Sequence, residues 1–208
     1  MSAIYIGYSA LDARRVYASG AAGIITFMFL SSFTPSPDAA MAERMLAALI
    51  PRGRDVVVLA IGSDRVTGDS LGPIVGHMLA LRGAEVYGDL RSPVTALNVM
   101  EVYELIRKRH PSAFVIAVDS AVGADADVGK IKVLPRGLRP AAVSGKKFPR
   151  VGGVSVIGVV SPERLGAKGL SGVRLGDVLP LAGAVSACIT NALRMSAEGV
   201  GNESSVTG

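Results

Sequence analysis

Short apolar runs alternate with longer amphipathic stretches along most of this chain. Residues 56–61 and 113–118 are continuous apolar runs rich in β-branched residues, as is typical of strands buried on both faces. Residues 96–110 carry apolar positions at helical spacing, and Pro111 ends that stretch. The alternation predicts a three-layer α/β fold with a mostly parallel sheet and helices on both of its faces.

Weaker patterns complete this plan. We expect helices over residues 39–50, with Asp38 as N-cap, and over residues 176–197, with an interruption near Pro180. We expect strands at residues 85–87, 129–134 and 154–160. A chain of 208 residues falls within the range of one domain, which we place at residues 38–198.

The two ends of the chain do not follow the alternation. Residues 1–37 are expected to form an apolar N-terminal extension, within which residues 16–33 carry no charge. Three interpretations stay open for this segment: an extension upstream of the domain, a buried strand around residues 23–30, and a membrane anchor. Residues 199–208 are rich in Gly, Ser and Thr and predict a disordered tail.

The composition limits the kinds of molecule that this chain is expected to bind. The net charge of +5 is thinly spread and only 5% of residues are aromatic, so nucleic-acid binding is not expected. Cys188 is the single cysteine, which excludes an internal disulfide and predicts a buried thiol. The loop over residues 136–153 is basic, and its Lys146 and Lys147 are candidate contacts for an acidic substrate, with a solvated surface loop as the competing interpretation.

The candidate chemistry lies where the first two buried runs end. A polar loop over residues 62–68 leads from the first run to a helix, and Asp69 stands at the junction. Asp119 directly follows the second run. The carboxyl ends of parallel strands share one edge of a sheet, so these carboxylates are expected to face each other and share a proton. A helix N-cap for Asp69 and a solvated loop acid for Asp119 are the competing interpretations.

Two other interpretations of this loop, a phosphate-binding loop and an esterase motif, do not fit its residues. A phosphate-binding loop needs four residues between its glycines and then a lysine, but Gly62 and Gly68 are separated by five and Asp69 follows. Residues 68–71 spell Gly-Asp-Ser-Leu, the motif of an esterase family whose serine relies on a histidine base from an Asp-x-x-His sequence. Neither histidine of this chain, His77 or His110, has an Asp three positions before it.

Residues 61–73, which read Ile-Gly-Ser-Asp-Arg-Val-Thr-Gly-Asp-Ser-Leu-Gly-Pro, resemble the signature of the YyaC-type sporulation proteins, a family similar to germination protease. Shorter matches lie at residues 87–90, 93–98, 115–120, 151–160 and 174–175. The resemblance implies a phosphorylase/hydrolase-like fold and places the catalytic aspartates at Asp69 and Asp119. The candidate substrate-binding residues around them are Asp64, Arg65, Thr67 and Ser70.

The same resemblance implies an aspartate-dependent peptidase in the cytoplasm of a sporulating cell, acting on proteins such as small acid-soluble spore proteins without a cofactor. Two alternatives remain: a non-catalytic sporulation protein that binds a partner in the same pocket, and a metal-dependent maturation endopeptidase. The maturation endopeptidases add a later histidine to the two acids, and no histidine follows His110, so no metal site is expected. Anchoring through residues 16–33 and assembly into a homo-oligomer stay open.

Overall fold

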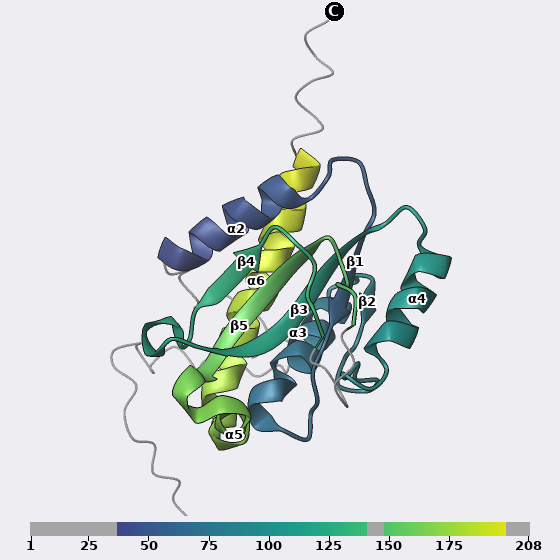
Figure 1. Cartoon of the computed structure of the whole chain (residues 1–208). Coiled ribbons are helices and arrows are strands. Elements are labelled where there is room, and N and C mark those ends of the chain that lie inside the picture. The colour runs from purple at the N-terminus through teal and green to yellow at the C-terminus, as the bar shows by residue number, and fades with distance from the viewer. Residues whose placement is uncertain (1–36, 141–147, 199–208) are drawn as a thin grey trace, which may run out of the picture. The chain divides into compact units, whose positions relative to one another are not determined.

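The computed structural model describes residues 37–140 and 148–198, which build a five-stranded sheet in the order β2-β1-β3-β5-β4 (Figure 1). β1, β2, β3 and β5 run parallel, and β4 pairs antiparallel with β5. This topology confirms the predicted α/β class with a mostly parallel sheet. The strands are β1 (Val56–Ala60), β2 (Val86–Tyr87), β3 (Phe114–Gly123), β4 (Ile131–Leu134) and β5 (Val154–Pro162).

Helices cover both faces of the sheet, as predicted. Figure 1 shows α3 and α6 on one face and α4 on the other. α2 packs against α6 and β4 and contributes to the core, α5 packs against β5, and three short 3-10 helices occur in the described connections. The helices are α2 (Pro37–Leu49), η2 (Thr67–Ser70), α3 (Leu71–Ala80), α4 (Val99–Arg109), η3 (Asp125–Asp127), η4 (Glu163–Leu165), α5 (Gly166–Gly172) and α6 (Leu175–Glu198).

The strands are buried on both sides because their side chains alternate between two apolar clusters. On one face, Val58 and Ile116 pack with Val185 of α6. On the other face, Val57 and Ala117 belong to a separate cluster that α4 closes. The continuous apolar runs in the sequence therefore have a direct physical cause.

Cys188 lies fully buried in α6, in agreement with the sequence prediction. Burial first, and the nearby Glu43 second, raise the pKa of this thiol to about 12. The thiolate is the reactive form of cysteine, so Cys188 is an inert core residue.

Two helix starts and one expected interruption differ from the prediction. α4 begins at Val99 because Thr95 N–H donates to Asn98 Oδ1 (2.7 Å) in a preceding turn, which leaves Leu97 83% exposed rather than on an apolar face. Asp38 lies inside α2, which already includes Pro37, so it is not the N-cap. Pro180 lies within α6 and does not interrupt it, because the buried residues on either side hold the helix against the sheet.

By length and composition α6 could cross a membrane, but half of its most apolar window is buried inside the fold. Its sequence is therefore that of a core helix. The predictions for residues 16–33 and 199–208, and for Lys146 and Lys147, fall outside the described residues.

Candidate functional site

The loop after β1 folds back on itself, so that Asp69 near its end contacts Ser63 near its start. The chain leaves β1 through Ile61, which bridges to Val94, and Gly62 has a φ of 148°. Ser63 N–H then donates to Asp69 Oδ2 at 2.7 Å. The N-cap of α3 is Ser70 and makes no side-chain capping bond, so the interpretation of Asp69 as the cap of this helix is wrong. Its carboxylate closes the loop instead.

Close backbone packing fixes the position of this loop. A Cβ on Gly62 would collide with the backbone oxygen of Asp69, and a Cβ on Gly72 would collide with the carbonyl oxygen of Ile61. The start of α3 therefore lies directly against the end of β1. Asp69 is held between them at the carboxyl end of the sheet.

Asp119 does not follow β3, as the sequence pattern predicted, but lies inside it. β3 continues to Gly123 because β5 pairs with it along this stretch, with Asp119 opposite Ile157. β1 ends at Ala60, which pairs with Val118. Beyond that point one edge of β3 has lost its neighbouring strand, and η2, which carries Asp69, packs against β3 there.

The two carboxylates lie within electrostatic reach of each other. Burial first, and the charge of Asp69 second, raise the pKa of Asp119 to about 8, against an opposing contribution from the Ser120 N–H bond. Burial also raises the pKa of Asp69, whereas the bonds from Ser63 and the Ser120 side chain lower it. Below about pH 8 Asp119 keeps its proton. Asp69 is the member of the pair whose charged form is stabilised by more hydrogen bonds.

Ser120 contacts both acids, and sequence reasoning assigned it no role. Its backbone N–H donates to Asp119 Oδ1 at 2.7 Å. Its hydroxyl lies close enough to Asp69 to lower the pKa of that acid. The one signal in the sequence is its place directly after the candidate acid, which is too common to indicate a function.

The other predicted site residues lie on the same loop with different exposure. Asp64 and Arg65 are exposed in the turn that follows Ser63. Thr67 and Ser70 begin and end η2, and the Ser70 hydroxyl donates to the Thr67 carbonyl oxygen at 2.6 Å. Ser70 is only 5% exposed, so its hydroxyl serves the loop itself.

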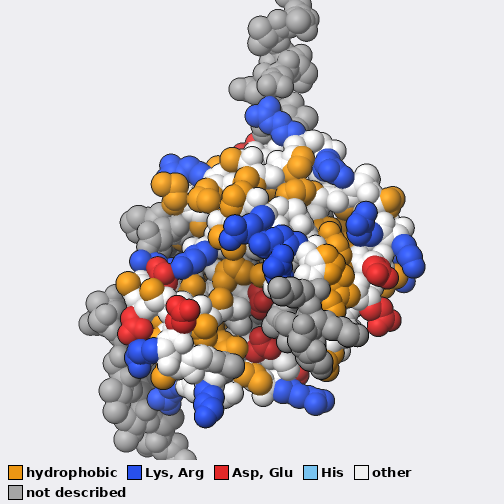
Figure 2. Space-filling model, viewed as in Figure 1, with side chains coloured by type: hydrophobic (Ala, Val, Ile, Leu, Met, Phe, Trp, Pro, Cys, Tyr) orange, Lys and Arg blue, Asp and Glu red, His pale blue; other side chains and the backbone are white. Residues whose placement is uncertain are grey.

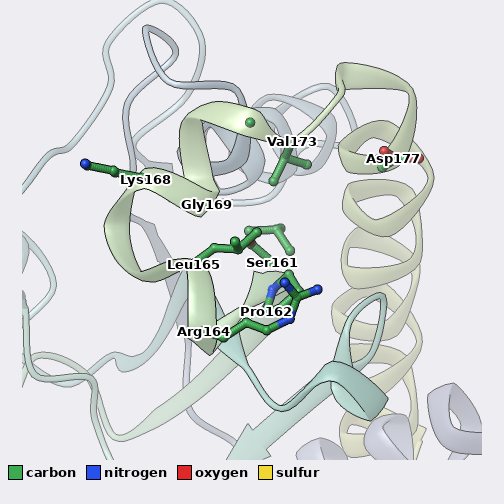
Figure 3. Close-up of a pocket in the computed structure, with 10 residues that line it drawn as sticks. Ser161, Pro162, Arg164, Leu165, Lys168, Gly169, Val173 and Asp177 are labelled. Atoms are coloured by element: carbon green, nitrogen blue, oxygen red, sulfur yellow. The ribbon is translucent and has the colours of Figure 1, made fainter.

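A cavity of about 470 Å³ opens at the carboxyl end of β5, between α5 and the start of α6 (Figure 3). Val160, Leu165 and Val173 give it an apolar lining, while Lys168 points away from it. Asp69 and Asp119 do not line this cavity. The helix α5 that borders it nevertheless touches the loop of Asp69, because Gly68 packs against the backbone of Leu170 in α5.

Basic side chains also gather on one face of the molecule. Figure 2 shows Lys and Arg side chains across the middle of one face, over the sheet and beside a smaller group of acidic side chains. Arg136, Arg139 and Arg150 are exposed at the two described ends of the β4–β5 connection. Leu138 and Val151 pair their backbones there, which joins those ends.

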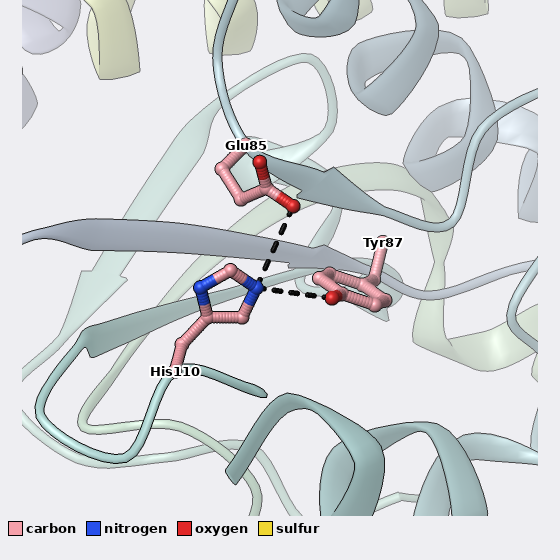
Figure 4. A network of polar contacts seen from close by, with 3 residues as sticks. All are labelled: Glu85, Tyr87 and His110. Atoms are coloured by element: carbon pink, nitrogen blue, oxygen red, sulfur yellow. Dashed lines mark hydrogen bonds and ion pairs between the residues drawn. The ribbon is translucent and has the colours of Figure 1, made fainter. Parts of the chain in front are cut away.

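A second polar cluster lies away from the acids. His110 Nε2 lies 3.0 Å from the Tyr87 hydroxyl and 3.6 Å from Glu85 Oε1 (Figure 4). Beside it, a cavity of about 260 Å³ is lined by Arg107 and by the first residues of β3, at the amino end of the sheet. This cluster ties the end of α4 to the edge strand β2.

The described part of the chain contains no group of three or more His, Cys, Asp or Glu side chains arranged to hold a metal ion. The acidic pair therefore has only two ligands of this kind to offer. Nickel and zinc favour imidazole or thiolate ligands, which the pair does not supply.

The raised pKa of Asp119 predicts a pH-dependent stability. Its pKa rises from the ordinary value of 3.8 to about 8 in the folded state, so the folded protein binds the extra proton between these values. Stability is therefore lost as the pH rises through this window. Asp119→Asn removes the ionisation, and we expect it to stabilise the protein by roughly 1–3 kcal/mol at about pH 9, after allowance for solvent screening of a partly exposed group.

Urea unfolding of both proteins at about pH 5 and about pH 9 measures this difference. The stabilisation by Asp119→Asn should grow with pH, whereas Asp127→Asn, a change in a surface ion pair with Lys132, should show no such growth. An equal effect of Asp119→Asn at both pH values would contradict the raised pKa.

Comparison with known proteins finds similarity at the level of family. The family described as "Protein of unknown function (DUF1256)" matches residues 34–188, which include both acids and every described strand. The chain is similar to "Uncharacterized protein YyaC" of Bacillus subtilis (strain 168), with 38% identity over 135 residues. That alignment spans 62% of this chain and 66% of the relative.

Proposed function

The chain belongs to the DUF1256 family, and we propose that it is an aspartate-dependent peptidase in which Asp69 and Asp119 act together on one water molecule. The observation that carries the proposal is that the two neighbouring carboxyl groups have unlike environments. The pKa of Asp119 is raised to about 8, whereas the burial that raises the pKa of Asp69 is opposed by hydrogen bonds that favour its charged form. Such a pair supplies an acid and a base at the same pH.

The roles follow from these protonation states. Asp69, as carboxylate, takes a proton from the water, and the water oxygen attacks the carbonyl carbon of the peptide bond. Asp119, protonated, donates its proton to the carbonyl oxygen. When the tetrahedral intermediate collapses, the proton held by Asp69 passes to the leaving amine nitrogen, and the carbon–nitrogen bond breaks. Asp119 regains its proton from the hydroxyl of the new carboxyl group.

Two features of the fold support a polypeptide as substrate. The apolar cavity beside α5 lies at the same end of the sheet as the acids and would hold a substrate side chain. The exposed Arg136, Arg139 and Arg150 would attract acidic stretches of a protein. From the YyaC relationship we further propose a role in sporulation, in the cytoplasm of the sporulating cell.

Cleavage assays over a range of pH test the proposal. The purified full chain should cleave small acid-soluble spore proteins, with products identified by mass spectrometry. Its rate should fall as the pH rises through about 8, where Asp119 loses its proton, and fall again in acid, where Asp69 gains one.

Each other outcome supports a different function. Activity that a chelator removes would favour the metal-dependent endopeptidase. Tight binding of these proteins without cleavage at any pH would contradict the peptidase and support a partner-binding pocket.

A further inference from the structure

The hydroxyl of Ser120 is a buried polar group without a hydrogen-bond partner of good geometry. Ser120 Oγ is the one such side-chain atom found among the described residues. An unsatisfied buried hydroxyl destabilises a fold, so each example calls for an explanation. Because the atom is buried from solvent, bulk water does not supply the missing partner.

The neighbours of this hydroxyl limit its partners. Ser120 follows Asp119 in β3, and its own N–H donates to Asp119 Oδ1 at 2.7 Å. Successive side chains of a strand point to opposite faces, so the hydroxyl points away from the side chain of Asp119. The polar group that it does influence is Asp69, on the loop that packs against β3 where β1 has ended.

We propose that Ser120 is a positioning residue for the acidic pair: its hydroxyl donates a hydrogen bond to the Asp69 carboxylate while its backbone N–H holds Asp119. In the structure this contact lacks the geometry of a full hydrogen bond, and hydrogen bonds of catalytic groups are often long in the free protein and tighten only when substrate binds. One residue thereby orients both acids and keeps Asp69 in the charged form that a general base requires.

This inference rests on the proposed function for its effect on catalysis, but its central test does not need activity. We expect Ser120→Ala to raise the pKa of Asp69 by about one unit, because a donor that favours the carboxylate is removed. Ser120→Thr keeps the hydroxyl, suits a strand and should restore the lower pKa. Carbon-13 NMR titration of the labelled Asp69 carboxyl group measures the pKa in each variant.

Ser155→Ala is the matched control. Ser155 is another serine of the sheet and is fully buried, but its hydroxyl donates to the Arg136 carbonyl oxygen at 2.8 Å. Its removal should lower the melting temperature without moving the pKa of Asp69. An Asp69 pKa that is unchanged in Ser120→Ala, or raised equally in Ser120→Thr, would overturn the proposal.

The kinetic expectation separates positioning from substrate binding. If the wild type cleaves a peptide, Ser120→Ala should lower kcat about tenfold with KM unchanged, and it should move the acidic limb of the pH profile upward. An unchanged kcat would overturn the positioning role. A wild type that cleaves nothing would refute the peptidase instead, and the titration would then decide the role of Ser120 by itself.

Discussion

Asp69→Asn and Asp119→Asn should each lower the rate of peptide cleavage by about 10²–10⁴-fold, which is the usual contribution of a general acid or base. Asparagine keeps the size and the accepting oxygen of each side chain. The bonds from Ser63 N–H to Asp69 and from Ser120 N–H to Asp119 can therefore persist. The loss should fall on proton transfer and not on folding.

Combining the two substitutions tests whether the acids work as one unit. The double variant should be no slower than the worse single variant, because a step that needs both groups is already lost when either is changed. Asp127→Asn serves as the control, since that acid pairs with Lys132 on the surface near the end of β3 and should leave cleavage intact. Cleavage that survives in both single variants would exclude the shared mechanism.

Gly72→Ala is expected to destabilise the fold by about 3 kcal/mol or more. A Cβ at this position would overlap the carbonyl oxygen of Ile61, which is backbone and cannot rotate away. Relief requires α3 to move off the end of β1, and Asp69, two residues before this helix, would move with it. Melting curves measure the stability, and the pKa of Asp69 from NMR reports whether its contact with Ser63 is kept.

Gly183→Ala provides the comparison within a helix. Gly183 lies in α6, and a Cβ there would meet no atom within 4 Å. Alanine is the better helix former by about 1 kcal/mol, so this substitution should leave the stability unchanged or raise it. Equal destabilisation by both substitutions would mean that the close approach of α3 to β1 is not what Gly72 provides.

The fold class could be predicted because it depends on a local property. A strand buried on both faces must be apolar along its whole length, and residues 56–61 and 113–118 show this without reference to any partner. The helix boundaries were harder to predict from the sequence. Leu97 is apolar and stands at helical spacing, yet it is exposed because a bond from Thr95 N–H to the Asn98 side chain delays the start of α4. Whether a side chain or the helix takes such a backbone group depends on three-dimensional contacts.

Sequence reasoning identified both acids of the candidate site but not what surrounds them. Asp69 and Asp119 follow recognisable strand patterns. The bond that holds Asp69 comes from Ser63, six residues earlier, and no periodic pattern reports such a contact. Ser120 escaped notice because serine after an acid is common, and its significance depends on a hydroxyl that is buried and unpartnered.

The sequence by itself determined the α/β class, the alternation of strands and helices, and the two acids near the strand ends, because these follow from local periodicity and residue type. Tertiary structure decided the pairing of β5 with β3, which extends β3 past Asp119, and the packing of η2 where β1 ends. It also decided the unlike pKa values of the acids. Burial and the distance between charges cause these shifts, and both arise only when segments distant in sequence pack together.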